Sequence, residues 1–304
     1  MKALRAHVRG GAEQLVFEDA PRPVPGPGDA LVAVRAAAIT LAEFDWDLSW
    51  QTRDGADRTP VVPSHEVSGV VEALGEGVSR PEVGQEVYGL IDFDRDGAAA
   101  QYVTVPAADL AAKPATVSHV EAATLPLAAL TAWQALVDQA AVQPGERVFI
   151  RGAAGGVGVY LVQLAAVLDA HVIASARPQD EAYVRDLGAD EFSDAGHLRG
   201  SIDVAIDTVG GPFIPASIDL LRPGGRLVTL AEPAPPGLAE SHDVRALFFV
   251  VRPDRAELAH LAALVDAGRL RPVVSQTFPL EEGRAAYESG AHPRRPGKIV
   301  LTVG

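Results

Sequence analysis

The chain has 304 residues, 48% of them hydrophobic and 22% charged, which is the composition of a globular protein able to form about two domains. Its formal net charge of −14 argues against a general affinity for nucleic acid or an anionic membrane. The absence of cysteine excludes disulfides, a thiol nucleophile and cysteine-bound zinc. The first residues lack the apolar core of a secretory signal, and no apolar run reaches the ~18 residues of a membrane span, so we expect a cytoplasmic protein.

Short apolar runs broken by Gly and Pro fill the chain from residue 1 to about residue 120. Such runs lie at 30–34, 67–71, 83–89 and 101–105. Short extended segments with turn residues between them are typical of sandwiches and barrels. The sequence therefore predicts a β-rich, partly barrel-like domain here.

From about residue 120 to residue 270, helical patterns alternate with short buried strands. We expect these strands at 148–151, 172–175, 204–207 and 227–230. This alternation predicts a parallel sheet wound on both faces. Short extended pieces return after Arg271, and the last one, at 298–303, is expected to rejoin the first domain.

A glycine cluster stands between a predicted strand and a mainly apolar helix at 159–168. Its members are Gly152, Gly155, Gly156 and Gly158. Glycine lets the backbone approach an anion closely, and the helix N-terminus adds free N–H groups and a positive dipole end. The order is similar to the dinucleotide fingerprint and predicts a phosphate site. Small residues that only let the helix pack against the sheet are the alternative interpretation.

The strand after the glycine cluster bears on the choice of cofactor, because NAD-selective domains place an acidic residue at its tip. Here the strand ends with Ser175 and Arg177, which can hydrogen-bond and neutralise a 2′-phosphate. The pattern therefore favours NADPH. Asp180 and Glu181 follow closely, and an ordinary solvated loop charge would also account for Arg177.

Several motifs in one order resemble the medium-chain dehydrogenase/reductase superfamily, most closely its zinc-independent quinone oxidoreductase (zeta-crystallin-like) branch. They lie at 63–71, 83–89, 130–133, 152–158, 187–190, 203–211, 221–228 and 297–301. The resemblance implies an α/β fold: a GroES-like β-rich barrel domain at 1–121 and 271–304, a Rossmann doubly wound parallel sheet at 122–270, and a cleft between them. It also implies NADPH-dependent reduction of quinones or α,β-unsaturated carbonyl compounds, usually by a homodimer.

The resemblance adds further cofactor contacts to the glycine loop, Ser175 and Arg177. The full expected set is Thr131, Gly152, Ala154, Gly155, Gly156, Val157, Gly158, Ser175, Arg177, Thr208, Val209, Gly210, Leu230, Ala231, Phe248, Phe249, Val250 and Lys298. Three alternatives stay open: Thr131 would equally cap a helix at 132–137, the two phenylalanines would equally pack in a core or dimer interface, and Lys298 would equally be a surface lysine.

The expected chemistry departs from that of zinc-dependent relatives, which carry Cys where this chain has Thr40, although the His65-Glu66 pair is retained. Zinc needs three suitable ligands, so we expect no metal. Without metal, a protein group must stabilise the negative charge that hydride transfer places on the substrate oxygen. Thr40 is the first candidate, His65 the second because its usual titration range suits proton delivery, and Tyr88 a weaker third. An ordinary strand threonine is the alternative for Thr40.

Two tryptophans, Trp46 and Trp50, lie in a segment that borders the substrate in relatives, so they are expected to form an apolar substrate wall or to pack a loop. Three rival functions remain: an alcohol dehydrogenase on simple carbonyls, a non-catalytic NADPH-binding regulatory protein, and a biosynthetic enoyl reductase. A serine hydrolase is not expected, because no G-x-S-x-G motif occurs.

Overall fold

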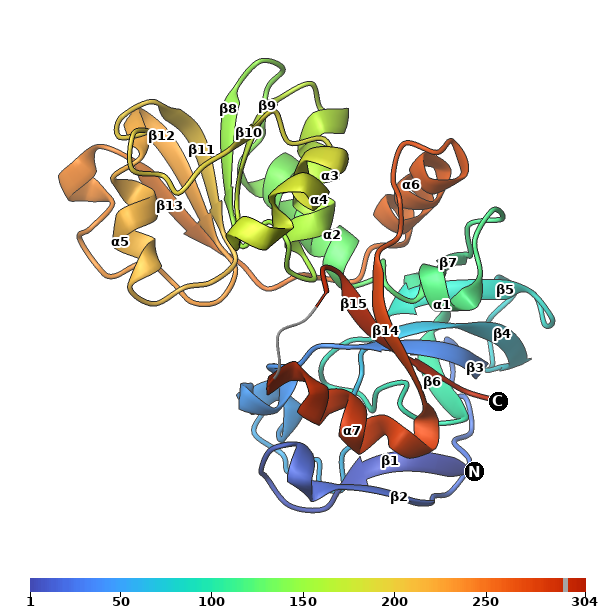
Figure 1. Cartoon of the computed structure of the whole chain (residues 1–304). Helices are drawn as coiled ribbons and strands as arrows, with labels where there is room; N and C mark the ends of the chain where they lie inside the picture. Colours follow the sequence, from blue (N-terminus) through green and yellow to red (C-terminus); the bar gives the residue numbers. More distant parts are fainter. Residues whose placement is uncertain (292–294) are drawn as a thin grey trace. The chain divides into compact units, whose positions relative to one another are not determined.

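The protein, described here by a computed structural model for residues 1–291 and 295–304, contains two compact units. Unit 1 consists of Met1–Leu127, Arg252–Gly268 and Pro272–Gly304, and unit 2 of Ala128–Val251 and Arg269–Arg271. The first and last parts of the chain thus belong to one unit, as Figure 1 shows by its blue and red ribbons. None of the helices among the described residues is both long and apolar enough to cross a bilayer.

Unit 1 is built mainly from strands. Its strands are β1 (Lys2–Ala6), β2 (Leu15–Asp19), β3 (Asp29–Ile39), β4 (Glu66–Leu74), β5 (Glu86–Leu90), β6 (Tyr102–Pro106), β7 (Leu110–Ala112), β14 (Val274–Pro279) and β15 (Lys298–Thr302). Its helices are α1 (His119–Ala122), α6 (Arg255–Asp266) and α7 (Gly283–Glu288), and its 3-10 turns are η1 (Ala12–Gln14), η2 (Glu43–Asp45), η3 (Asp47–Ser49), η4 (Ala107–Asp109), η8 (Leu280–Glu282) and η9 (Ser289–Ala291).

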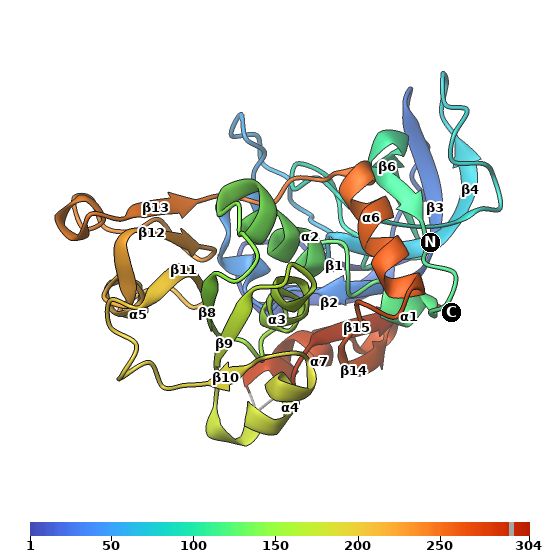
Figure 2. The same cartoon turned by 90° about the horizontal axis from the view of Figure 1, so that it is seen from above.

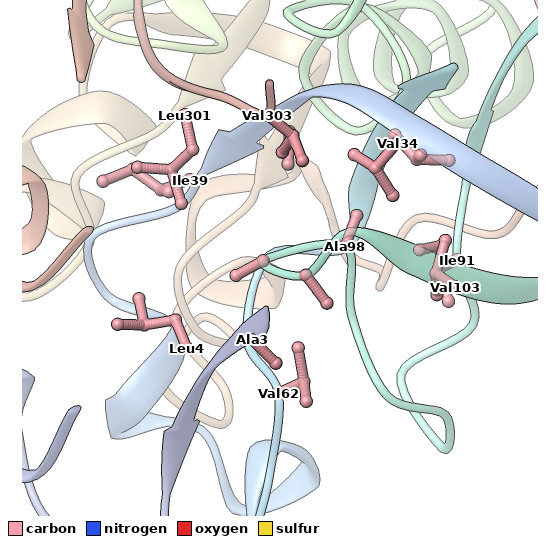
Figure 3. Close-up of a cluster of buried hydrophobic side chains, with 14 of the residues drawn as sticks. Ala3, Leu4, Val34, Ile39, Val62, Ile91, Ala98, Val103, Leu301 and Val303 are labelled. Carbon is pink, nitrogen blue, oxygen red and sulfur yellow. The ribbon is translucent and has the colours of Figure 1, made fainter. Parts of the chain in front are cut away.

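The main sheet of unit 1 joins distant parts of the sequence. Within the described chain its order is β14-β15-β3-β4-β5-β7, with β6 also paired to β3. The C-terminal strand β15 lies antiparallel to β3, so the tail does rejoin the first domain. Apolar side chains from β1, β3 and β15 meet in a core, where Figure 3 shows Leu4, Ile39 and Leu301. Alternate residues of β3 are buried on this side because strand side chains point to opposite faces.

Unit 2 alternates strands and helices. Its elements are α2 (Ala128–Trp133), the π-helical turn η5 (Gln134–Gln139), β8 (Arg147–Arg151), α3 (Gly158–Val167), β9 (His171–Ser175), η6 (Pro178–Asp180), α4 (Glu181–Asp186), β10 (Glu191–Phe192), β11 (Ile202–Asp207), α5 (Phe213–Ile218), β12 (Leu221–Thr229), η7 (Glu240–His242) and β13 (Arg245–Phe248).

The strands of unit 2 form a parallel sheet, whose order in the described chain is β10-β9-β8-β11-β12-β13. In Figures 1 and 2, α3 lies beside β8 and β9, whereas α5 lies beside β11 and β12. The middle residues of the central strands, Val148–Ile150 of β8 and Val204–Ile206 of β11, are apolar and fully buried because helices and neighbouring strands cover them. The expected Rossmann-type parallel sheet is confirmed.

The unit boundaries differ from those expected from the sequence. Unit 1 extends to Leu127 rather than residue 121, and the segment that carries α6 clusters with unit 1 rather than with the sheet of unit 2. Two polar contacts join this segment to the rest of unit 1: the Tyr88 hydroxyl donates to the Leu258 carbonyl at 2.5 Å, and Asp266 accepts from the Thr116 amide at 2.9 Å.

Candidate active site

The carboxyl ends of the parallel strands in unit 2 lie in register at one edge of the sheet. Arg151 at the end of β8 pairs with Ser175 of β9 and Asp207 of β11, and Asp207 pairs with Thr229 of β12. The loops that follow these strands therefore lie side by side. Ligands of open parallel sheets bind at this edge, so the topology assembles one candidate nucleotide site from four separate loops.

The glycine loop has close backbone contacts that side chains would prevent. Gly152 has φ 78°, and a Cβ added there would lie 2.2 Å from the Thr208 hydroxyl oxygen. A Cβ on Gly158 would lie 2.1 Å from the Gly152 carbonyl oxygen. These two glycines thus let β8, the turn and α3 follow one another within a few residues.

Several amides of this loop are available to a ligand. Gly155 N–H donates to the Gly152 carbonyl, and the Gly152 N–H donates to Ser175 O. In contrast, the amides of Ala154, Gly156, Val157 and Gly158 donate to no group within the described chain. They precede or open the ten-residue helix α3, whose N-terminus carries a positive partial charge. The arrangement fits a diphosphate, which accepts several such bonds.

A buried network that sequence reasoning missed holds the neighbouring turn at residues 208–210. The Asp207 carboxylate, fully buried, accepts from the Val209 and Gly210 amides, each at 2.9 Å. Its second oxygen accepts from the Ser217 hydroxyl at 2.7 Å and lies 3.4 Å from Arg151 Nε. The buried charge is thus both paired and hydrogen-bonded. An acidic residue at the end of a buried strand was the available signal.

The loop after β9 places the two expected 2′-phosphate residues close to each other in sequence and space. Ser175 is half-buried, and Arg177 is exposed. Arg177 Nε donates to Asp180 Oδ2 at 2.8 Å, and the Asp180 side chain is 8% exposed. The Arg177 guanidinium, which the sequence analysis assigned to the 2′-phosphate, is therefore already paired with the Asp180 carboxylate.

The other expected cofactor residues of unit 2 fall into two groups. Leu230, Ala231, Phe248, Phe249 and Val250 follow or end strands β12 and β13 and are half-buried or exposed, so the two phenylalanines are not core residues. Thr131 is buried within α2, three residues after its start. The helix-cap alternative for this threonine is therefore wrong, because the helix begins earlier than the sequence indicated.

Strand register in unit 1 gathers a second set of polar side chains. Ile299 of β15 lies opposite Ile39 of β3, and Ala38 of β3 lies opposite Glu66 of β4. Lys298, Thr40 and Glu66 therefore meet at the same end of the three neighbouring strands β15, β3 and β4. Lys298 Nζ lies 2.6 Å from Glu66 Oε2 and donates to Thr40 Oγ1 at 3.0 Å. Glu66 Oε1 accepts from the Leu127 amide at 2.9 Å.

Glu43 is a buried acid beside this set that the sequence did not single out. One carboxylate oxygen accepts from the Ser64 amide at 2.9 Å, and the other accepts from the Tyr287 hydroxyl. Burial raises the pKa of Glu43 to about 7, although both hydrogen bonds and the Lys298 charge act in the opposite direction. The carboxyl group joins η2, α7 and the residue at φ 73°, Ser64, that precedes His65.

His65 is buried against an aromatic side chain, with the charged residues Arg58 and Asp92 near enough to act on it. Its ring is buried and lies 5.0 Å from the Phe93 ring, which in turn makes an edge contact with Trp46 at 5.7 Å. Burial, assisted by the Arg58 charge, lowers the pKa of His65 to about 4. The imidazole is therefore neutral at pH 7, and the titration argument used for it in sequence analysis does not hold.

Two expected site residues are core residues. Tyr88 is fully buried in β5, and its hydroxyl donates to a backbone carbonyl of α6, so it has no proton to offer a substrate. Trp50 is 4% exposed, packs 5.8 Å from the Phe44 ring and donates to the Phe44 carbonyl, so it belongs to the core of unit 1. Trp46 is half-buried and remains a candidate substrate contact.

The residues retained from a zinc site do not form one here. Within residues 1–291 and 295–304, no three His, Cys, Asp or Glu side chains gather closely enough to hold a metal ion. Thr40 stands at the position where we expected zinc-dependent relatives to carry a cysteine. Its hydroxyl accepts a hydrogen bond from the Lys298 ammonium group instead. The donor set therefore does not fit a zinc ion.

Two protein families match the chain. The alcohol dehydrogenase GroES-like domain matches residues 26–115, and the zinc-binding dehydrogenase family matches residues 179–301. A probable mitochondrial zinc-binding oxidoreductase of Arthroderma benhamiae is 31% identical over 309 residues, which cover 93% of this chain and 92% of that protein. A polyketide synthase system protein of Streptomyces orinoci, NorB, is 36% identical over 97% of this chain, but the chain spans only 14% of its length.

Solved structures with the same architecture cover the whole chain. A quinone oxidoreductase from Coxiella burnetii has a TM-score of 0.88 and 29% identity, with 100% of this chain and 99% of that chain covered. An NAD-dependent alcohol dehydrogenase has a TM-score of 0.89 and 30% identity, with 100% of both chains covered. These two likenesses are to a quinone oxidoreductase and to an alcohol dehydrogenase, two of the functions that the sequence left open.

Proposed function

Because the chain belongs to the medium-chain dehydrogenase/reductase superfamily, we propose that it is an NADPH-dependent, zinc-independent reductase of quinones and α,β-unsaturated carbonyl compounds. Membership was expected from the sequence and is confirmed, as is the GroES-like domain. The chain is an oxidoreductase of this superfamily, and the family implies a nicotinamide cofactor. The choice of NADPH, the substrate class, zinc independence, the homodimer and the cytoplasmic location are parts of the proposal.

The carboxyl edge of the unit 2 sheet carries the proposal. Four loop amides without acceptors in the described chain, at the start of α3, would hold the diphosphate of the cofactor, and the turn fixed by Asp207 lies beside them. Ser175 and Arg177 would hold the 2′-phosphate, and neither residue is an acid that would repel it. When bound, the reduced nicotinamide supplies a hydride.

Unit 1 supplies the group that meets the negative charge on the substrate. The Thr40 hydroxyl is half-buried and donates to no group of the described chain, so its proton is available to a carbonyl oxygen. The Phe93 ring packs against both the buried, neutral His65 and the half-buried Trp46, and this aromatic group would line the substrate side of unit 1. A dry setting strengthens a hydrogen bond to a developing oxyanion.

Turnover tests this function directly. We expect purified protein to oxidise NADPH with 2-cyclohexenone and with a para-quinone, to be much slower with NADH, and to leave cyclohexanone unreduced. The rate is expected to be unchanged after dialysis against EDTA, because the donor set does not fit zinc. NADPH consumption is followed by absorbance, with heat-denatured protein as the control for the spontaneous reaction of the quinone.

Each rival function has its own outcome in this assay. Rapid reduction of cyclohexanone would identify an alcohol dehydrogenase, and EDTA-sensitive turnover would contradict zinc independence. Tight NADPH binding without oxidation by any substrate would indicate a regulatory NADPH-binding protein. Preference for enoyl thioesters over free enones would indicate a biosynthetic enoyl reductase.

A further inference from the structure

The Lys298–Glu66 ion pair of unit 1 is almost completely buried, which is not the setting in which an ion pair stabilises a fold most. The two side chains are 6% and 1% exposed, and the nitrogen lies 2.6 Å from the carboxylate oxygen. Removing two charges from water costs about as much free energy as their attraction returns, so a buried ion pair seldom adds net stability. The presence of this pair, at the ends of the neighbouring strands β15 and β4 flanking β3, therefore indicates a role other than stability.

The ammonium group also contacts the one hydroxyl that the proposed reaction uses. Lys298 Nζ donates to Thr40 Oγ1 at 3.0 Å, across 258 residues of sequence. A hydroxyl that accepts a hydrogen bond from a cation becomes a stronger donor through its own proton. Because the Thr40 hydroxyl donates to no described group, this strengthened donor is available to a ligand.

We propose that Lys298 is a positioning residue that polarises the Thr40 hydroxyl, so that the Lys298–Thr40 pair takes the place of a metal ion as the electrophile that binds the substrate oxygen. The inference rests on the proposed function and adds to it a role for Lys298 other than cofactor binding. Glu66 holds the ammonium group in place through Oε2, while its Oε1 is fixed by the Leu127 amide.

In the proposed reaction the Lys298–Thr40 pair donates a hydrogen bond and transfers no proton. The β carbon of the enone accepts hydride and forms a new C–H bond, and the electron pair of the C=C bond moves so that negative charge settles on the carbonyl oxygen. Thr40 donates a hydrogen bond to that enolate oxygen, and Lys298 keeps its proton. A proton from water then adds to the α carbon and completes the saturated carbonyl product.

A double-mutant cycle tests this role. The first change is Lys298→Met with Glu66→Gln, which removes both charges and keeps an acceptor for the Leu127 amide; the second is Thr40→Val. We expect the paired change to slow single-turnover reduction of 2-cyclohexenone at saturating NADPH by about 100-fold when Thr40 is present. In the Thr40→Val background the same change should slow it less than about twofold, since the residue through which Lys298 acts is gone.

Lys113 and Glu86 provide the matched control. The Lys113 side chain is also 6% exposed and pairs with Glu86 at 3.4 Å, but it contacts the carbonyls of Pro114 and Val117 rather than Thr40. Lys113→Met with Glu86→Gln should therefore leave the reduction rate within about twofold. Equal slowing by the Lys298 change with Thr40 intact and in the Thr40→Val background, or a loss explained entirely by a raised NADPH Kd, would overturn the proposal.

A readout without turnover separates this proposal from the proposed function. The chain has only three lysines, Lys2, Lys113 and Lys298, so 15N-lysine labelling gives a side-chain spectrum that single variants can assign. We expect a protected Lys298 ammonium signal at pH 7 that shifts in Thr40→Val. If that signal is present while the wild-type protein reduces no substrate, the function fails and not the contact; if no protected signal exists, the polarised pair is wrong.

Discussion

Arg177 carries the cofactor preference at the scale of single residues. Its guanidinium pairs with Asp180 at 2.8 Å, and the Asp180 carboxylate is shielded from water. The acid that follows closely in the sequence therefore directly balances the cation proposed to bind the 2′-phosphate. NADPH preference depends on how much of the Arg177 charge remains effective, which substitutions on both sides of the pair can measure.

Substitutions of Arg177 and of Asp180 should change the affinity for NADPH in opposite directions. Arg177→Gln should weaken NADPH binding about 10- to 100-fold and NADH binding less than about threefold, since only NADPH has a phosphate for this cation. Asp180→Asn should strengthen NADPH binding, because it removes a competing negative charge. Fluorescence titration of the wild-type protein and both variants with each nucleotide measures the six dissociation constants. Arg185→Gln is the control, since Arg185 has nearly the same exposure, 44% against 45%, in an ordinary helical pair with Glu181.

Equal losses for NADPH and NADH in Arg177→Gln would contradict the phosphate assignment and indicate a general role in the loop. The sequence supplied this candidate because a strand end followed by a short loop is a local pattern. It could not supply the ion pair, since the Arg177 rotamer depends on the 3-10 turn η6 that follows.

At the scale of the elements, the Glu43 side chain connects η2, α7 and the segment ahead of β4 in unit 1. This buried acid of η2 is bound by the Tyr287 hydroxyl of α7 and the Ser64 amide ahead of β4, and the Phe44 and Tyr287 rings lie 5.0 Å apart. Burial raises its pKa from the ordinary 4.5 to about 7. Between these two values the folded protein keeps a proton that the unfolded chain has released, so stability falls as pH rises through this window.

Glu43→Gln should remove this pH dependence, because glutamine keeps the size and one acceptor oxygen but does not titrate. The free energy of unfolding of the wild-type protein, relative to that of the variant, should fall by roughly 3 kcal/mol between pH 4.5 and pH 8. Urea unfolding across this range gives the comparison. The buried His65, with its lowered pKa, acts in the opposite direction in both proteins and cancels in the difference. Parallel pH curves would show that Glu43 does not titrate in this window.

The main elements were within reach of sequence analysis. The β8, glycine loop, α3 and β9 succession was predicted because each part depends on local periodicity and on glycine's backbone freedom. The cluster at Thr40 was not, since Lys298 reaches Thr40 only through the pairing of β15 with β3. Trp50 was misassigned for a similar reason: which of two nearby tryptophans is buried depends on the packing of Phe44.

At the scale of the whole molecule, the two units carry different parts of the proposed chemistry. Unit 2 has the amides and Arg177 at the carboxyl edge of its parallel sheet, and unit 1 has the Lys298–Thr40–Glu66 cluster at the edge formed by β3, β4 and β15. The two ends of the sequence belong to the same unit, so the family's discontinuous domain is reproduced in a chain of 304 residues.

The central claim is that hydride passes from NADPH to the β carbon of an activated alkene. NADPH deuterated at both C4 positions, used with 2-cyclohexenone and followed by mass spectrometry and NMR of the product, tests it most directly. We predict cyclohexanone carrying a single deuterium at the former β carbon. Deuterium at the carbinol carbon of an allylic alcohol, or a product without deuterium, would contradict the account.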